Sequence, residues 1–128
     1  MSNLNEMVEM FLSEDKKIYK SNKPIALLNC SIITADGEYR QTTVSLDWVR
    51  ETTANNEIIS AIGHDSTAQI MTELLGINVP INRINFEQQP GQDAIVFKLN
   101  GRAPEGKILS REEIEEIGYT FKFLERTF

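Results

Sequence analysis

Residues 66–75 read STAQIMTELL, and this stretch decides the middle of the fold. Its apolar side chains fall on one helical face: Ile70, Met71, Leu74 and Leu75. Ser66 and Gln69 have the spacing of a capping box, which predicts that the helix begins at Ser66. Gly76 then acts as a stop signal, because glycine readily adopts the left-handed conformation that ends many helices. The pattern predicts an amphipathic helix that buries one face.

Short segments around this helix have the composition of β-strands. Residues 25–30 (IALLNC) form an apolar run typical of a buried strand, and residues 39–46 contain threonines and a valine that favour an extended chain. Residues 119–124 alternate aromatic and polar side chains, which predicts a final strand. Residues 83–87 and 94–99 flank a Gln-Pro-Gly-Gln turn and predict a β-hairpin.

Other segments favour helices. Residues 47–53 can form a helical turn, and residues 57–62 (EIISAI) have the pattern of a short helix that Gly63 ends. Ser110 and Glu113 have the spacing of a second capping box, ahead of further apolar residues. Together with the strands, these helices predict an α/β fold, a single domain with a mixed sheet of about five strands flanked by three or four helices.

The first part of the chain is predicted to be an extension of this domain. Four apolar residues recur there with helical spacing: Leu4, Met7, Val8 and Phe11. Residues 13–24 are charged and polar and end in Ser-Asn-Lys-Pro, which favours a linker. We therefore expect a helical extension and linker over residues 1–24 and the main domain over residues 25–128.

Composition limits the classes of function. A chain of 128 residues suits one domain, and its net charge of -6 argues against a protein that coats DNA or RNA. No apolar stretch approaches the roughly 18 residues that a membrane span requires, and the amino-terminal residues lack the pattern of a signal peptide. Cys30 is the one cysteine, so no internal disulfide can form. We expect a cytoplasmic protein that binds neither DNA nor membranes.

The segment Gly63 to Thr67 (GHDST) is the first candidate for a functional site. A helix that begins near Ser66 presents backbone N–H groups and the positive end of its dipole, which together attract an anion. Gly63 lets a ligand approach the backbone closely, and His64 can give or take a proton near neutral pH. The next three residues can cap the helix or contact the ligand: Asp65, Ser66 and Thr67. The same segment also fits a simple helix stop and N-cap with a solvated histidine.

Residues 100–107 (NGRAPEGK) are the second candidate, a loop that follows a predicted strand. Arg102 offers a planar fork of donors for a phosphate group, and Lys107 adds a point charge. Glu105 can act as a base or orient a ribose hydroxyl. Taken alone, the loop also fits a solvated connection with ordinary charges.

The end of the first predicted strand is the third candidate. Asn29 and Ser31 can bind the polar edge of a ligand there, although they equally fit a strand end that satisfies its own backbone. Cys30 lies between them. We do not expect it to act as a nucleophile, because nothing in the sequence places His64 beside it.

Two runs of residues resemble the viral anti-CRISPR ring nuclease family, which acts against type III CRISPR immunity. They are Ile62 to Thr67 (IGHDST) and Arg102 to Leu109 (RAPEGKIL), and the acidic segment over residues 110–116 also fits. The resemblance covers residues 25–128. The extension before it is not part of the minimal family domain, and residues 35–57 match poorly.

The resemblance implies an activity and an assembly. Members of this family are homodimers that bind cyclic tetra-adenylate (cA4), the second messenger of type III CRISPR defence, in a pocket on the dimer two-fold axis. They are metal-independent phosphodiesterases that use no cofactor, and they cut the ring to linear di-adenylates, which switches the defence off. The expected partners are therefore cA4 and a second copy of the chain.

The resemblance also implies which residues form the site. The catalytic residues of the family fall on His64, Arg102 and Glu105. Substrate-binding residues are expected at seven further positions: Asn29, Ser31, Gly63, Asp65, Ser66, Thr67 and Lys107. Ser31 is displaced by one residue from the serine of the family pattern. No metal ligand is expected.

These residue types fit RNA cleavage by internal attack of a ribose 2′-hydroxyl on the adjacent phosphate. His64 would protonate the leaving 5′-oxygen, and Arg102 would hold the phosphate oxygens. Glu105 would orient or activate the hydroxyl, or keep His64 charged. Two alternatives stay open. One is a protein that sequesters cyclic oligoadenylate without cutting it, and the other is an interaction module whose amino-terminal helix docks a CRISPR effector.

Overall fold

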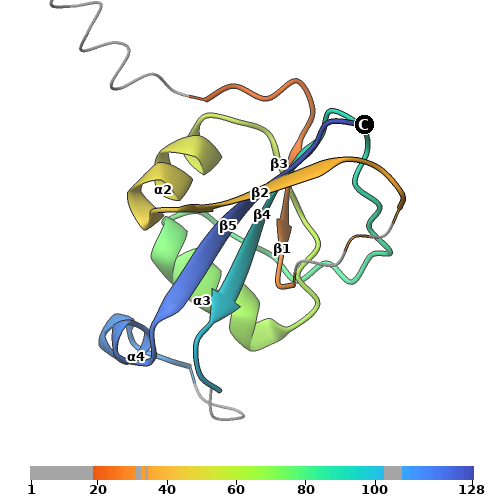
Figure 1. Cartoon of the computed structure of the whole chain (residues 1–128). Coiled ribbons are helices and arrows are strands. Elements are labelled where there is room, and N and C mark those ends of the chain that lie inside the picture. Colours follow the sequence, from red (N-terminus) through yellow and green to blue (C-terminus); the bar gives the residue numbers. More distant parts are fainter. Residues whose placement is uncertain (1–18, 31–32, 34, 103–107) are drawn as a thin grey trace, which may run out of the picture.

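The computed structural model describes residues 19–30, 33, 35–102 and 108–128 of the chain (Figure 1). In chain order its elements are β1 (Ile25–Leu28), β2 (Tyr39–Val44), α2 (Leu46–Ala54), β3 (Ile58–Ser60), α3 (Asp65–Leu75), β4 (Asp93–Leu99), α4 (Arg111–Ile117) and β5 (Tyr119–Arg126). No helix within these described ranges is long and apolar enough to cross a membrane.

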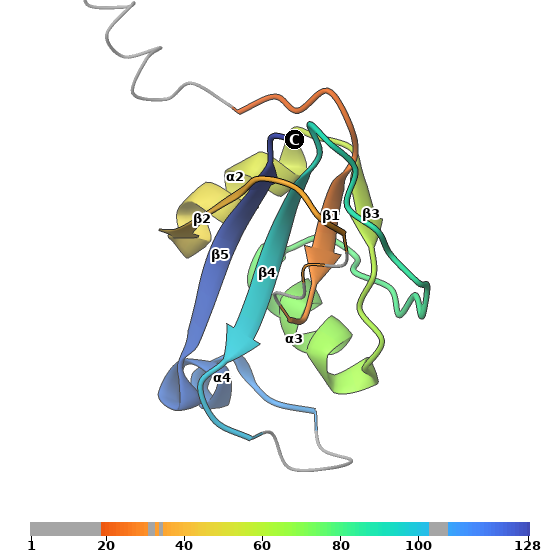
Figure 2. The same cartoon turned by 45° about the vertical axis from the view of Figure 1, so that its right-hand side comes forward.

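The five strands form one mixed sheet in the order β2-β5-β4-β1-β3. β1 runs parallel to both β3 and β4, whereas β5 runs antiparallel to both β4 and β2. The described helices lie on one face of the sheet, behind the strands in Figure 2. This arrangement confirms the predicted α/β class. It also brings the carboxyl ends of the neighbouring strands β1 and β4 to the same edge of the sheet.

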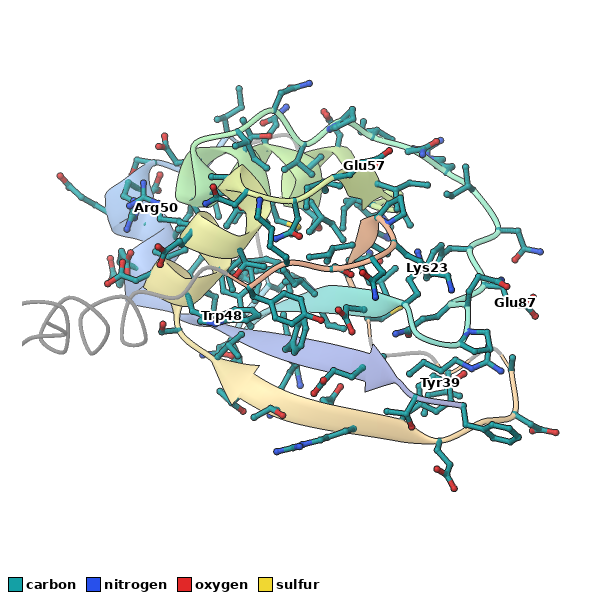
Figure 3. The ribbon with its side chains drawn as sticks, turned by 90° about the horizontal axis from the view of Figure 1, so that it is seen from above. Lys23, Tyr39, Trp48, Arg50, Glu57 and Glu87 are labelled. Atoms are coloured by element: carbon teal, nitrogen blue, oxygen red, sulfur yellow. The ribbon has the colours of Figure 1, made fainter. Side chains whose placement is uncertain are left out.

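The main hydrophobic core lies between the sheet and the helices. Its fully buried side chains come from both layers and include Ile25, Leu27, Met71, Leu74, Ile95, Ile114 and Phe121. Trp48 of α2 reaches toward the sheet (Figure 3), and its ring centroid lies 4.9 Å from that of Phe123. Burial of the apolar face of α3 in this core fixes the helix against β1 and β4.

A smaller apolar cluster lies on the opposite face of the sheet and consists of Ala26, Leu28, Ala94, Val96 and Leu124. Phe86, from the segment between α3 and β4, packs against this cluster, as does Tyr39 of β2. Toward the end of β4 the same face becomes polar, because Lys98 stands two residues beyond Val96 and is exposed.

Most predicted elements outside residues 57–92 are confirmed. The three strands predicted outside the hairpin are β1, β2 and β5, and the predicted helical turn after residue 46 is α2. α4 begins with the predicted capping box. The backbone N–H of Glu113 donates to Ser110 Oγ at 3.2 Å, and the backbone N–H of Ser110 donates to Glu113 Oε1 at 3.0 Å.

The prediction of a helix over residues 57–62 is wrong. Residues 58–60 form β3, which pairs in parallel with the buried strand β1. The Ser60 hydroxyl also donates to the carbonyl oxygen of Pro80 at 2.6 Å. The two isoleucines of β3 are β-branched and favour strands, and pairing with a buried neighbour outweighs the helical spacing of the apolar residues.

The prediction of a β-hairpin is also wrong, since only its second strand exists. β4 covers Asp93–Leu99, but residues 83–87 form no strand. β4 pairs with β1 on one side and with β5 on the other, so neither of its edges is open to a hairpin partner. The Gln88 side chain instead donates to the carbonyl oxygens of Gln92 at 2.7 Å and Leu124 at 3.0 Å, which holds this segment beside the sheet.

Residues 19–24 pack against the domain. The ring centroid of Tyr19 lies 5.4 Å from that of Phe123, and its hydroxyl donates a hydrogen bond to Asp93. The Ser21 hydroxyl donates to the same carboxylate at 3.2 Å. The last part of the predicted linker therefore contacts the sheet. The predicted amino-terminal helix lies outside the described residues.

Candidate functional site

The amino end of α3 differs from its prediction. The helix begins at Asp65, and His64 occupies the N-cap position with extended backbone angles. The capping box predicted between Ser66 and Gln69 is wrong because both residues lie inside the helix, where the Gln69 side-chain amide donates to Asp65 Oδ2 at 3.2 Å. The His64 side chain makes no capping hydrogen bond. Backbone N–H groups of the first turn therefore remain available at the helix end where His64 lies.

A cavity of about 290 Å³ opens beside this helix end. Its polar lining comes from the ends of three elements: Asn29 after β1, Ser66 and Thr67 in α3, and Lys98 and Gly101 at and beyond the end of β4. Its apolar walls are Ile70, Phe97 and Leu99. The carboxyl ends of two parallel strands thus meet the start of a helix at the lower edge of the sheet in Figure 2. Ligand sites of α/β proteins commonly lie at this edge.

The structure brings part of the predicted site together. Three predicted residues line the cavity: Asn29, Ser66 and Thr67. Gly63, His64 and Arg102 do not line the cavity themselves. Gly63 and His64 directly precede the helix, and the His64 side chain is exposed. Arg102, also exposed, follows directly after Gly101 of the cavity lining.

The remaining four predicted residues are also not among those that line this cavity in the described structure. Asp65 lines a separate hollow of about 680 Å³ on another side of α3, together with Gln69 and Thr72. Three predicted residues lie outside the described part of the chain: Ser31, Glu105 and Lys107.

Arg83 is a residue near the site that the sequence did not single out. Its Nε donates to the carbonyl oxygen of Gly63 at 2.9 Å, and the backbone N–H of Asn82 donates to the carbonyl oxygen of Ile62 at 2.8 Å. These bonds tie the segment after α3 to the backbone that leads into His64. Arg83 is exposed and is bonded through Nε, and its two terminal NH₂ groups form no hydrogen bond with other described residues, so they can face an anionic ligand.

Lys98 is a second residue that the sequence reasoning missed. It interrupts an otherwise apolar strand (AIVFKL, residues 94–99), and a charged residue within such a run is a signal that could have identified it. Among the described residues that line the cavity, Lys98 is the one cation and none is a carboxylate. With the positive end of the α3 dipole at the same place, the electrostatics favour an anion.

Chemically, the arrangement can bind an anionic ligand beside an exposed imidazole. Within the described residues, no group of three or more histidine, cysteine, aspartate and glutamate side chains is placed to hold a metal ion. The fold and the cavity define a single-domain α/β protein with a candidate anion-binding site at the carboxyl edge of its parallel strands.

The chain belongs to the STIV B116-like family, whose model matches residues 25–121. It is 38% identical over 104 residues to protein YddF of Bacillus subtilis (strain 168), an alignment that covers 80% of this chain and 96% of that protein. It is 32% identical over 83 residues to protein 26 of Sulfolobus islandicus filamentous virus (isolate Iceland/Hveragerdi), covering 64% and 70% of the two chains. A third relative is protein ORF117 of Acidianus two-tailed virus, 36% identical over 73 residues, covering 56% and 62%.

The fold is similar to a solved structure, that of B116 of Sulfolobus turreted icosahedral virus. The TM-score is 0.66 at 22% sequence identity, and the match covers 80% of this chain and 99% of that chain. At this identity the likeness concerns the fold. The range that the family model matches includes His64, Arg102 and the whole cavity lining.

Proposed function

We propose that this protein is a ring nuclease that binds cA4 and cleaves it to linear di-adenylates, which would switch off type III CRISPR defence. The observation that carries the proposal is the position of His64. It occupies the N-cap position of the helix whose first turn lines a cavity that favours an anion, and Asn29, which follows β1, lines the same cavity. A cyclic oligonucleotide supplies the phosphate groups that such a helix end favours.

The symmetry of the ligand supports a homodimeric enzyme. A ring of four identical nucleotides has an internal two-fold axis, which a dimer of this chain can share. Each protomer would then place one His64 at one of two opposite phosphodiesters. The cavity of about 290 Å³ beside α3 is smaller than a tetranucleotide requires, so most of the ligand would lie against other surfaces, including those of a second copy.

The proposed reaction needs no external nucleophile. The ribose 2′-oxygen attacks the adjacent phosphorus, the bond from phosphorus to the 5′-oxygen breaks, and a 2′,3′-cyclic phosphate forms. Protonated His64 donates its proton to the leaving 5′-oxygen. Arg102 stabilises the charge on the phosphate oxygens, and Glu105 orients the 2′-hydroxyl and accepts its proton as the new bond to phosphorus forms.

The first test is to incubate the purified protein with cA4 in EDTA and to separate the products by chromatography, beside a His64→Ala variant. Cleavage by the parent to products with a 2′,3′-cyclic phosphate or 3′-phosphate and a 5′-hydroxyl, lost in the variant, is the expected result. Tight binding of cA4 without cleavage by either protein would favour the sequestering protein instead. Failure to bind cA4 would reject the proposed ligand.

A further inference from the structure

The face of the sheet that points away from the helices carries two lysines side by side. Phe97 and Phe121 belong to the core on the helix side, so the residues next to them in each strand point to the opposite face. Val96 pairs with Lys122 across β4 and β5, and Lys98 is two residues further along β4. The two lysines are therefore diagonal neighbours on this face, with Cα atoms about 7–8 Å apart.

Both lysines line one cavity of about 560 Å³ on this face. The rest of its polar lining is neutral and includes Asn29, Gln41, Asn100 and Thr120. Within the described part of the chain, no carboxylate lines this cavity and neither lysine forms an ion pair. The chain has a net charge of -6, whereas this surface is locally positive.

The ammonium group of Lys122 is held on the sheet surface. Its Nζ donates to Thr43 Oγ1 at 2.8 Å, across the strand pair of β2 and β5. Lys122 is half-buried, whereas Lys98 is exposed. An ammonium that is already positioned loses less side-chain freedom when a ligand binds, so it contributes more to affinity than a freely moving one.

This second cavity adjoins the one beside α3. Asn29 and Lys98 line both, because the ends of β1 and β4 separate the two faces of the sheet there. A ligand that lies over this edge can therefore contact the start of α3 with one part and the two lysines with another.

We propose that Lys98 and Lys122 bind phosphate groups of the cyclic oligoadenylate other than the one being cleaved, which makes the open face of the sheet part of the substrate site. This inference rests on the proposed function. Each ammonium neutralises ligand charge that the acidic chain would otherwise repel. The side-chain amides of Gln41 and Asn100 add the paired donor and acceptor that match the edge of an adenine base.

The test measures cA4 affinity of the parent and of Lys122→Gln, Lys122→Arg and Lys98→Gln at several salt concentrations. Arg50→Gln, which removes an exposed cation from α2 on the other side of the molecule, is the charge-matched control. Each lysine-to-glutamine change is expected to raise Kd about tenfold and to make binding less dependent on salt, as loss of a charge-assisted phosphate contact does. Lys122→Arg keeps the charge and should restore most of the affinity, and Arg50→Gln should match the parent.

The outcomes separate the two proposals. If the parent binds cA4 and Lys122→Gln keeps the parental Kd and salt dependence, the lysine site is wrong and the ring nuclease proposal stands. If the parent does not bind cA4, both are wrong. A purely structural role, in which the lysine stem covers apolar sheet, would lower the Tm of Lys122→Gln without changing its Kd, and that result also overturns the inference.

Discussion

Arg83 donates a hydrogen bond from Nε to the carbonyl oxygen of Gly63, 20 residues earlier in the chain, at a distance of 2.9 Å. The bond joins the irregular segment between α3 and β4 to the residue that precedes His64. A Cβ atom added at Gly63 would lie 3.6 Å from Arg83 Cγ, an ordinary contact distance. The position of His64 therefore depends on a residue outside the motif that contains it.

We expect Arg83→Ala to slow cA4 cleavage about tenfold, because it removes both the bond to Gly63 and a cation beside the helix end. Arg83→Gln keeps a side-chain donor without the charge, and it separates the two effects. Single-turnover cleavage at saturating cA4 and the Kd report on positioning and on binding respectively. If Arg83→Ala keeps the parental single-turnover rate and the parental Kd, Arg83 contributes to neither positioning nor binding.

Substitution of His64 tests the general acid directly. His64→Ala is expected to lower the single-turnover rate by roughly two to four orders of magnitude, the usual contribution of one proton donor. Affinity for cA4 should fall far less, since the backbone groups of α3 do not depend on the side chain. Single-turnover cleavage and equilibrium binding of the same preparation measure the two quantities. A variant that cuts as fast as the parent would exclude His64 as the acid.

The contacts of Tyr19 predict a dependence of stability on alkaline pH. Burial and the neighbouring Asp93 carboxylate raise the pKa of the Tyr19 hydroxyl above its ordinary value of 10.0. Above about pH 10 the unfolded chain therefore loses this proton while the folded protein keeps it, and the free energy of unfolding falls as pH rises. Denaturant unfolding measured at a series of pH values above about 10 should show that the free energy of unfolding falls less steeply with pH in Tyr19→Phe than in the parent. Tyr119, whose pKa is also raised, accounts for a remaining decline. Parallel profiles for parent and variant would contradict the expectation.

Truncation tests the boundary of the extension. A chain that lacks residues 1–18 keeps Tyr19 and Ser21, with their bonds to Asp93, and should retain the Tm of the full chain and its cA4 cleavage. Tyr19→Ala in the full chain should instead lower the Tm by several degrees, because the ring packs on Phe123 and Trp48. Thermal melting of the three proteins provides the comparison. Lost cleavage with an unchanged Tm in the truncated chain would place a functional contact in the extension.

Local patterns in the sequence predicted the elements that depend on residues close together in the chain. The helix over residues 66–75 and the capping box at Ser110 depend on side chains within a few positions of one another, and the structure contains both elements. β3 was mistaken for a helix because its strand character comes from pairing with β1, which periodicity does not reveal. The hairpin failed for a related reason, since whether β4 has an open edge depends on the order of all five strands.

Part of the candidate site could be predicted from the sequence and part could not. The motif around His64 could be found because its residues are contiguous, and the cavity at the start of α3 contains Ser66 and Thr67 from that motif. No pattern in the neighbouring sequence distinguishes Arg83 or Lys122. Each is identified by a contact with a residue far away in the chain, Arg83 with Gly63 and Lys122 with Thr43. Their roles follow from tertiary contacts, which a single sequence does not show.

Cys30 gives the open face of the sheet a natural chemical handle. It is the one cysteine of the chain, it is exposed, and it lines the cavity that Lys98 and Lys122 share. A thiol-reactive fluorophore would therefore attach at a single position without any engineered substitution. Its emission would change when a ligand enters that cavity, so the arrival of a nucleotide could be followed in real time on the unmutated protein.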